Sequence, residues 1–329
     1  MKTKSVLVTG AAGFLGRVVG DHLSTEAKSV RRMVRRPDPT LRGDVVTADL
    51  LDSDALHNAL RGIDVVVHLG GRAHIMGKDP DARTAFLRTN VDGTRLLLDE
   101  AIRAGVDCFL FFSSVKAVGE MNDTPWTEAI VPRPVDPYGI SKLKAEELVR
   151  ERGSSSGMHT AILRLPLAYG PGMKGNMIRL FDAVKHGIPL PFRNVRNRRS
   201  MVFSGNVAAA VSSVLRSPRA FGETFFVSDG SDLSTAELLR AVGIALGKSP
   251  NLFPVPPWLL TSAARLGDTI GKVRPFPINS DVVQRLIGSL TVDISKLRAL
   301  TDYKPPFSVQ NALLETASWY ESRGVLSQG

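Results

Sequence analysis

Short hydrophobic runs alternate with helix-like segments through the first half of the chain. The runs predict buried strands at residues 6–8, 29–34, 44–47, 64–68, 109–112 and 160–165. Apolar residues recur at helical spacing between them, for example over 53–60, where Ser53 is a candidate N-cap, and over 83–104. Strands that alternate with helices form parallel sheets covered on both faces, so we expect an α/β fold.

The first predicted strand runs into a turn that has a glycine at every third position. Gly10, Gly13 and Gly16 are followed by apolar residues at helical spacing, which predicts a strand, a tight turn and a helix start. Glycines at such a turn let main-chain N–H groups approach a pyrophosphate closely. Because an ordinary strand-turn-helix unit can carry the same pattern, the turn alone only suggests dinucleotide binding.

The composition changes after a Pro- and Gly-rich turn at 169–172. A strand-like segment at 223–227 precedes a capped helix that begins near Ser234, and prolines punctuate 253–258. We therefore predict one domain at residues 1–170 and a smaller lobe at 171–329, some segments of which return to the sheet. The apolar segment 256–270 is short and has few basic residues, so we interpret it as a core or oligomer-packing helix and not as a membrane-surface helix.

Composition narrows the class of protein. The chain has 329 residues, of which 43% are hydrophobic and 22% charged, as in soluble globular proteins. Its one cysteine, Cys108, precedes an apolar run and is expected in a buried strand, so a disulfide framework is excluded and a cytoplasmic setting is favoured. We expect no signal peptide and no membrane span, because no apolar run is long enough.

The net charge of +10 points to an anionic partner. Nucleic acid is not expected, because aromatic residues make up only 6% of the chain and no nucleic-acid-binding motif is present. Basic clusters at 31–36 and 193–199 carry much of the excess and suggest phosphate contacts. His68 and His74 have no cysteine or carboxylate pattern around them, so we predict no metal site.

Two further motifs carry chemistry. Ser113 and Ser114 end the predicted strand at 109–112, and ligands of parallel sheets lie beyond the carboxyl ends of the strands. Tyr138 and Lys142 are four apart on one helix face, where an ammonium would lower the tyrosine pKa and make it a usable acid or base. Each motif alone has an ordinary structural interpretation as turn serines or a surface helix.

The order of the three motifs is specific. A glycine turn, serines after the fifth strand and Tyr-x-x-x-Lys on the next helix resemble the extended short-chain dehydrogenase/reductase family, which includes nucleotide-sugar epimerases, dehydratases and reductases. The resemblance covers about residues 5–320. It implies a Rossmann-type doubly wound parallel sheet with a smaller C-terminal substrate-binding lobe, a UDP-sugar substrate and a homodimer packed through the long helices after the fourth and fifth strands.

The resemblance also implies roles for single residues. Ser114 would hydrogen-bond the reacting oxygen, Tyr138 would be the acid–base group, and Lys142 would stabilise the phenolate and bind the nicotinamide ribose. Cofactor contacts are implied for Gly10, Gly13, Phe14, Leu15, Gly16, Asp49, Leu50, Leu69, Gly70, Gly71 and Asn90, besides Tyr138 and Lys142. Asn176, Arg199 and Arg285 match groups that contact the nucleotide diphosphate.

Two departures from the family pattern refine the expected function. Relatives that prefer NAD carry an acidic residue after the second strand, whereas this chain has Arg35 and Arg36, so we expect NADP(H) with Arg35 as the first contact and NAD(H) as the alternative. Dehydratases carry Asp-Glu directly after the serine, whereas this chain has Val115-Lys116 there, which argues against a dehydratase. Glu120 and Glu128 are the carboxylates that we expect near the crevice.

The segment after Ser114 is similar to a bacterial branch of 4-keto reductases in surface-polysaccharide synthesis, which form UDP-N-acetylquinovosamine. Our leading hypothesis is therefore a cytoplasmic NADP(H)-dependent oxidoreductase that reduces C4 of a UDP-linked 4-keto-6-deoxy amino sugar. One alternative is a UDP-hexose or UDP-N-acetylhexosamine 4-epimerase that retains NAD. Another is a non-catalytic NADP(H)-sensing protein.

Overall fold

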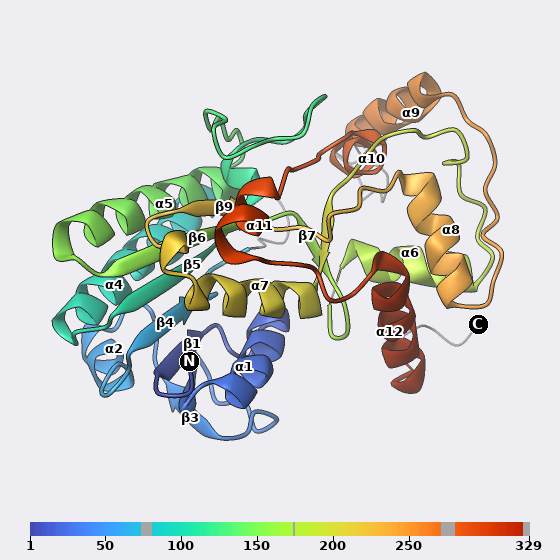
Figure 1. The fold of residues 1–329 in the computed structure, drawn as a ribbon. Helices are drawn as coiled ribbons and strands as arrows, with labels where there is room; N and C mark the ends of the chain where they lie inside the picture. Colours follow the sequence, from blue (N-terminus) through green and yellow to red (C-terminus); the bar gives the residue numbers. More distant parts are fainter. Residues whose placement is uncertain (74–80, 174, 271–279, 325–329) are drawn as a thin grey trace.

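A parallel β-sheet forms the centre of the computed structural model, which describes residues 1–73, 81–173, 175–270 and 280–324 (Figure 1). Its order in the described residues is β3-β2-β1-β4-β5-β6-β9, and every neighbouring pair is parallel. The strands are β1 (Ser5–Thr9), β2 (Ser29–Val34), β3 (Asp44–Thr47), β4 (Val65–His68), β5 (Cys108–Ser114), β6 (His159–Leu165) and β9 (Thr224–Phe226). The predicted doubly wound sheet is confirmed, with its topological switch point between β1 and β4.

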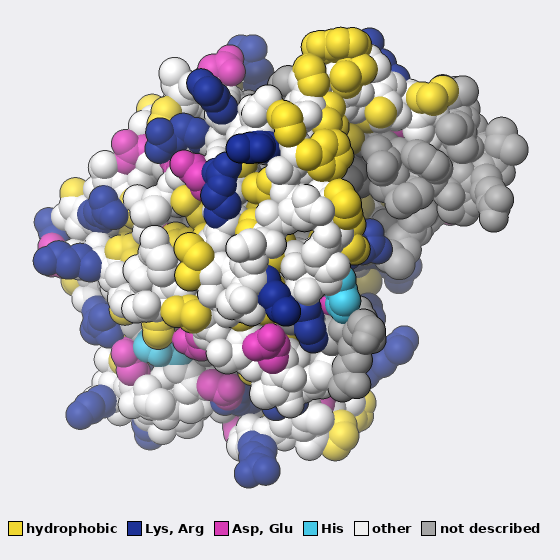
Figure 2. Space-filling model, turned by 90° about the vertical axis from the view of Figure 1, so that its right-hand side faces the viewer, with side chains coloured by type: hydrophobic (Ala, Val, Ile, Leu, Met, Phe, Trp, Pro, Cys, Tyr) yellow, Lys and Arg dark blue, Asp and Glu magenta, His cyan; other side chains and the backbone are white. Residues whose placement is uncertain are grey.

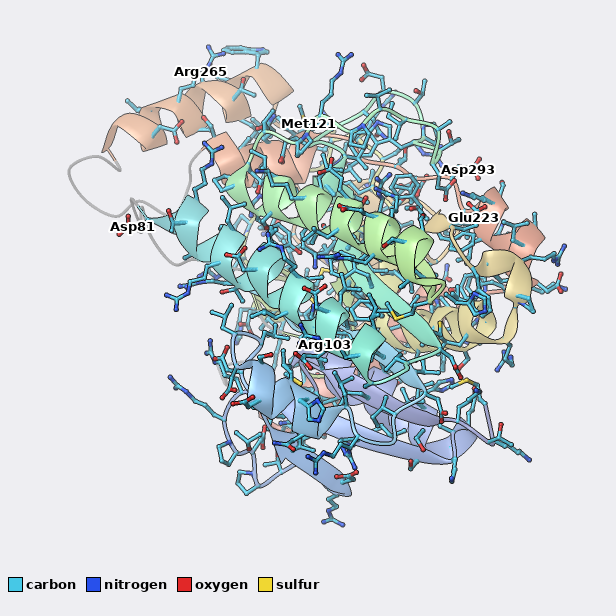
Figure 3. All side chains as sticks on the ribbon, turned by 90° about the vertical axis from the view of Figure 1, so that its left-hand side faces the viewer. Asp81, Arg103, Met121, Glu223, Arg265 and Asp293 are labelled. Atoms are coloured by element: carbon cyan, nitrogen blue, oxygen red, sulfur yellow. The ribbon has the colours of Figure 1, made fainter. Side chains whose placement is uncertain are left out.

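Helices cover both faces of the sheet because its strands are apolar on both sides. Val6 and Val8 belong to one buried cluster, and Leu7 belongs to the other. Helices α1 (Phe14–Glu26), α7 (Ser204–Arg216) and α11 (Ser295–Thr301) lie on the first side. On the second side lie α2 (Ser53–Ala59), α4 (Gly93–Arg103) and α5 (Pro137–Ser156), and Figure 3 shows α4 beside α5.

Two local predictions needed refinement. The segment predicted as one helix over 83–104 is α3 (Ala82–Leu87) and α4, joined by a π turn at Arg88–Asp92. The predicted N-cap Ser53 is wrong by one residue. Asp52 caps α2 by accepting a hydrogen bond from the Ala55 N–H at 3.0 Å, while the Ser53 hydroxyl donates to Glu100 at 2.7 Å.

The lobe that follows has its own apolar core. Strand β7 (Leu167–Tyr169) pairs with β8 (Met201–Phe203), and the core also takes side chains from α6 (Asn176–Lys185), α8 (Thr235–Ala245) and α12 (Val309–Ser322). Helices α9 (Pro257–Ile270) and α10 (Ser280–Ile287) pack on each other at its edge. The start of α8 carries a capping box between Ser234 and Glu237, as predicted.

A buried carboxylate links the lobe to the sheet. Asp229 follows β9 and accepts hydrogen bonds from the Tyr169 hydroxyl at 2.8 Å, the Phe203 N–H at 2.8 Å and the Asn206 amide at 2.7 Å. Asn206 also accepts from the Phe307 N–H at 2.9 Å. Burial raises the pKa of Asp229, and the three donors oppose that rise. Asp229 therefore connects β7, β8 and α7, and Asn206 extends this network to the segment before α12.

Helix α9 is more exposed than a core helix would be, and its alternative interpretation as an oligomer-packing helix stays a prediction. Trp258 is 65% exposed and Leu266 is 63% exposed. Ala264 is buried, Leu260 packs against the core of the lobe, and α9 also packs on α10. In the described ranges, no helix combines the length and apolar character needed to cross a membrane.

Candidate active site

The glycine turn after β1 has the geometry that a dinucleotide cradle requires. Gly10 has a φ of +66°, and a Cβ there would lie 2.8 Å from the Gly70 nitrogen. A Cβ on Gly16 would lie 2.1 Å from the Gly10 carbonyl oxygen, so the start of α1 packs on the turn only with glycine. Gly13 is the N-cap of α1 and has no side chain to satisfy the free N–H groups of the first turn. Phe14 and Leu15 begin this helix.

A buried histidine, His68, organises the hydrogen bonds beside the glycine turn. His68 Nδ1 lies 2.7 Å from Thr9 Oγ1, which also accepts a hydrogen bond from the Gly70 N–H at 2.9 Å. His68 Nε2 lies 3.0 Å from Thr94 Oγ1, whose hydroxyl donates to the Asn90 carbonyl at 2.7 Å. These partners assign the proton to Nε2. Burial lowers the pKa of His68 to about 3, so this packed histidine is neutral and holds Leu69, Gly70 and Gly71 in place.

The acidic-apolar pair after β3 reaches the same region. Leu50 lies against Gly70, and a Cβ on Gly93 would come within 2.9 Å of it. Asp49 is exposed, and its carboxylate accepts a hydrogen bond from the Leu51 N–H at 2.9 Å. Leu50 therefore forms an apolar wall beside the turn after β4.

Asn90 joins two elements through its amide. Oδ1 accepts from the Arg72 N–H at 2.7 Å, and Nδ2 donates to the Arg72 carbonyl at 2.9 Å and to Ser141 Oγ at 2.9 Å. Asn90 is buried within the π turn. These hydrogen bonds hold the segment after β4 against α5.

Ser114, Tyr138 and Lys142 meet at the carboxyl end of β5. Ser114 is the last residue of β5, and its Oγ accepts a hydrogen bond from the Lys116 N–H at 3.2 Å. It is close enough to Tyr138, in the first turn of α5, to lower the pKa of that phenol. Lys142 is buried one turn further, and its Nζ lies 4.2 Å from the centroid of the Phe111 ring. Gly139 lets the start of α5 pack closely on the main chain after β5, because a Cβ there would lie 2.2 Å from the Lys116 carbonyl oxygen.

Burial dominates the electrostatics of this group. It raises the pKa of Tyr138 to about 12, the hydrogen bond from Ser114 opposes the rise, and the charge of Asp136 adds to it. Burial also lowers the pKa of Lys142 to about 8, against the charge of Glu146. We expected Lys142 to lower the pKa of Tyr138, whereas that pKa is raised; burial is the largest cause, and Lys142 is not among the causes of the shift. Tyr138 is therefore a protonated acid at neutral pH.

Glu146 is a buried member of the site that the sequence reading missed. It accepts hydrogen bonds from Ser113 Oγ at 2.6 Å, from Arg164 at 2.7 and 3.0 Å, and from Arg150 at 2.8 Å. Burial alone would raise its pKa, but Arg164, Ser113 and Arg150 together lower it. The signal for it was an acidic residue one helical turn after Lys142, on the same face.

Lys116 stands where dehydratases carry an acidic group, and its ammonium lies next to two carboxylates. Its Nζ pairs with Glu120 and lies 3.7 Å from Asp136 Oδ2. Burial and the neighbouring Asp136 raise the pKa of Glu120. Glu128 is not part of this cluster, because its carboxylate accepts a hydrogen bond from the Phe226 N–H at 2.8 Å beside β9.

Two arginines of the lobe, Arg199 and Arg285, influence each other electrostatically. Arg199 exchanges main-chain hydrogen bonds with Leu233 at 2.9 and 3.2 Å, and its guanidinium donates to the Gly288 carbonyl at 3.2 Å. Burial lowers its pKa, the positive charge of Arg285 on α10 lowers it further, and Glu120 opposes this. Asn176 begins α6, but its side chain lies outside the described structure.

The segment after β2 presents basic groups. Arg35 and Arg36 are exposed directly after the strand. The acidic residue of this segment, Asp38, is engaged: it pairs with Arg17 and accepts hydrogen bonds from the Thr40 N–H at 3.0 Å and the Thr40 hydroxyl at 2.6 Å. No metal-binding cluster of three His, Cys, Asp or Glu side chains occurs in the described residues, and His74 lies outside them.

Comparison with known proteins agrees with this geometry. The profile of the NAD dependent epimerase/dehydratase family matches residues 6–227. The chain is 36% identical over 323 residues to a protein named UDP-glucose 4-epimerase from Vibrio cholerae, covering 95% of this chain and 94% of the relative. It is 30% identical over 342 residues to a 3 beta-hydroxysteroid dehydrogenase/Delta 5-->4-isomerase from Mycobacterium tuberculosis, covering 96% of this chain and 90% of that protein.

Solved structures share the fold over nearly the whole chain. UDP-glucose 4-epimerase from Thermotoga maritima, solved with UDP-glucose, has a TM-score of 0.77 at 20% identity and covers 97% of this chain and 99% of its own. UDP-glucuronic acid 4-epimerase from Bacillus cereus, solved with NAD, has a TM-score of 0.76 at 22% identity with the same coverage. With the glycine cradle and the full-length relatives, the match places this chain in the NAD dependent epimerase/dehydratase family.

Proposed function

We propose that the chain is an NADP(H)-dependent oxidoreductase that reduces C4 of a UDP-linked 4-keto-6-deoxy amino sugar. The observation that carries the proposal is a buried, protonated Tyr138 near Ser114 and one helical turn before the buried Lys142 on α5. Relatives and structural neighbours named as UDP-sugar 4-epimerases support a sugar carbon next to this group.

The proton chemistry follows from the positions of three side chains. Ser114 hydrogen-bonds the C4 ketone oxygen, and Tyr138 donates its phenol proton to that oxygen as it becomes a hydroxyl. The Lys142 ammonium stabilises the phenolate that remains, one helical turn away. The nicotinamide cofactor, when bound, supplies the hydride. The residues fit such a cofactor, since Gly10 and Gly16 let the turn pack closely on its neighbours and Gly13 leaves the first N–H groups of α1 without a side-chain cap.

Arg35 and Arg36 support the choice of NADP(H). A guanidinium pairs well with a 2′-phosphate, whereas NAD-preferring sites offer a carboxylate to the ribose hydroxyl. Asp38 is the acidic residue of the segment, and Arg17 and Thr40 already occupy its oxygens. In the lobe, Arg199 and Arg285 bring two positive charges together, and the diphosphate of a UDP-sugar would neutralise them.

The test follows NADPH oxidation with UDP-4-keto-6-deoxy-N-acetylglucosamine as substrate. We expect net oxidation with NADPH and a slower rate with NADH. Arg35→Asp should reverse that preference, while Arg323→Asp, the same charge change on an exposed distant arginine, should leave it unchanged. No oxidation of either nucleotide by this ketone would contradict the reductase.

A second candidate, a UDP-glucose 4-epimerase that retains NAD, is favoured by the name of the Vibrio cholerae relative. Release and identification of the cofactor from purified protein separates the two. Bound NAD without a 2′-phosphate, together with interconversion of UDP-glucose and UDP-galactose without net nucleotide change, would select the epimerase. Loss of both activities in a well-folded protein that still binds NADPH would select the sensing role.

The proposal includes a homodimer that packs through α4 and α5. Figure 3 shows the two helices side by side on one face of the molecule, which gives a continuous helical surface for a second copy. Light scattering of the purified chain measures its mass directly, and a monomer at micromolar concentration would contradict this part of the proposal.

A further inference from the structure

Arg17 connects the glycine turn to the segment after β2. Its Nε donates a hydrogen bond to the Ala12 carbonyl in the turn at 3.2 Å, and its guanidinium pairs with Asp38 in the segment. The turn and β2 are also joined by the Ala11 N–H, which donates to the Met33 carbonyl at 3.2 Å. In a Rossmann-type unit the adenosine ribose of the cofactor lies between these two segments. Arg17 therefore lies at the place where a 2′-phosphate distinguishes NADP(H) from NAD(H).

Both oxygens of the Asp38 carboxylate have partners within the protein. Oδ1 accepts hydrogen bonds from the Thr40 N–H at 3.0 Å and from the Thr40 hydroxyl at 2.6 Å, and Oδ2 pairs with Arg17. The two hydrogen bonds from Thr40 and the charge of Arg17 hold the pKa of Asp38 below its ordinary value, so the group is ionised at neutral pH. Without Arg17, the segment would present an uncompensated negative charge close to Arg35 and Arg36.

The surface around this place carries charges of both signs. Helix α1 and strand β3 lie at the bottom of Figure 1, and in the lower half of Figure 2, which turns the molecule about the vertical axis, Asp and Glu side chains lie among Lys and Arg side chains. Charges further away than about 10 Å are also screened by salt. The choice between the two cofactors therefore depends on how the few charges around the ribose are paired.

We propose that Arg17 sets the preference for NADP(H) by neutralising Asp38, so that Arg35 and Arg36 attract the 2′-phosphate. This inference rests on the proposed function, in which NADP(H) is the cofactor, and it adds a residue that acts through another side chain. An unpaired carboxylate at this place would repel a phosphate and would accept hydrogen bonds from a free ribose 2′-hydroxyl. The ion pair therefore removes the feature that would favour NAD(H) from a segment that contains an acidic residue.

Binding of adenosine nucleotides to the full chain tests the inference without any sugar substrate. The probes are 2′,5′-ADP and 5′-AMP, which differ in the 2′-phosphate alone, and calorimetric titration at fixed salt gives the ratio of their dissociation constants. Arg17→Gln should reduce the preference for 2′,5′-ADP by about fivefold, the effect of one uncompensated charge near a phosphate in water. Arg17→Lys keeps the positive charge and should keep the preference. Both variants should bind 5′-AMP as the original chain does, because the glycines of the turn are unchanged.

The double variant Arg17→Gln/Asp38→Asn separates an action through Asp38 from a direct contact with the phosphate. With both charges removed, the preference should return to within about twofold of the original. A preference that stays as low as in Arg17→Gln would overturn the inference, because Arg17 would then bind the phosphate itself. Arg216→Gln is the matched control and should leave the ratio unchanged, since it breaks an ion pair of 3.1 Å to Glu26 at the other end of α1.

The same titrations separate this inference from the proposed cofactor. Equal affinities of the original chain for the two probes would contradict the preference for NADP(H) itself. A preference for 2′,5′-ADP in the original chain that Arg17→Gln retains in full would overturn the role of Arg17 alone.

Discussion

Tyr138 and Lys142 show how burial and neighbouring charge compete within one turn of α5. Sequence spacing places the two groups one helical turn apart, and Ser114 is close enough to Tyr138 to lower its pKa. The spacing does not reveal how completely the protein removes water from both side chains. That desolvation keeps the phenol protonated and lowers the pKa of Lys142.

Tyr138→Phe removes the phenol proton and keeps the ring against Phe86, whose centroid is 5.7 Å away. We expect turnover to fall by about 10²–10⁴-fold, because a positioned acid contributes an effect of that size. Cofactor affinity, measured by fluorescence titration with NADPH, should stay within a few-fold. Turnover at the original level in this variant would remove Tyr138 from the acid role.

The lowered pKa of Lys142 determines how we expect the turnover to change at alkaline pH. Its pKa is lowered to about 8, so its ammonium is lost as the pH rises through that value, while Tyr138 stays protonated. We expect kcat for reduction to decline above pH 8. In Lys142→Arg the guanidinium stays charged, so any residual activity should no longer decline there. A decline at the same pH in this variant would assign it to another group.

Some elements around the site follow from local sequence patterns, whereas others depend on contacts between residues that are distant in sequence. The glycine turn, the strands and the capping box of α8 follow from short-range sequence signals, and the structure has them. The π turn that carries Asn90 does not, because it depends on the bonds that Asn90 makes to Arg72 and Ser141, which are distant in sequence. The ion pair between Glu146 and Arg164 is equally non-local, since it joins α5 to β6.

Glu146→Gln tests that ion pair. The substitution leaves Arg164, which is 3% exposed, without its negative partner. We expect a loss of about 3–5 kcal/mol in the free energy of unfolding, measured by denaturant titration. Because the pKa of Glu146 is lowered from 4.5, this stabilisation is full above that pH and is lost as the pH falls below it. Glu147→Gln, on the exposed side of the same helix, should change little, and similar losses in both variants would refute the assignment.

At the level of the whole molecule, the lobe and the sheet are connected rather than separate bodies. The chain returns to the sheet at β9, and Asp229 then binds β7, β8 and α7 in the interior. Sequence indicated that some later segments return, but not which side chain joins them. It also led us to expect α9 in a core or an oligomer contact, because an apolar pattern does not tell which surface covers it.

Ligand binding should therefore stabilise the entire fold in one transition. Saturating UDP or NADP⁺ at about 100 times its dissociation constant adds about 2.7 kcal/mol, observable as a higher thermal midpoint. Arg199→Met should abolish the rise caused by UDP and keep the rise caused by NADP⁺. Loss of both rises, in a variant with normal secondary structure, would mean that Arg199 supports the fold and is not a diphosphate contact.

The π turn between α3 and α4 has a consequence for changes in chain length. A π turn holds one more residue than a regular helix does, and Asn90 lies within it. Deletion of one residue from Arg88–Asp92 would let the segment close into a continuous α-helix, so that α3 and α4 keep their orientation and the change falls on the turn that holds Asn90. The Asn90 side chain would leave the widened turn, and its hydrogen bonds to the segment after β4 and to α5 would be lost. This stretch should accept many exchanges of side chain yet reject the loss of a single residue, which a library of one-codon deletions would reveal.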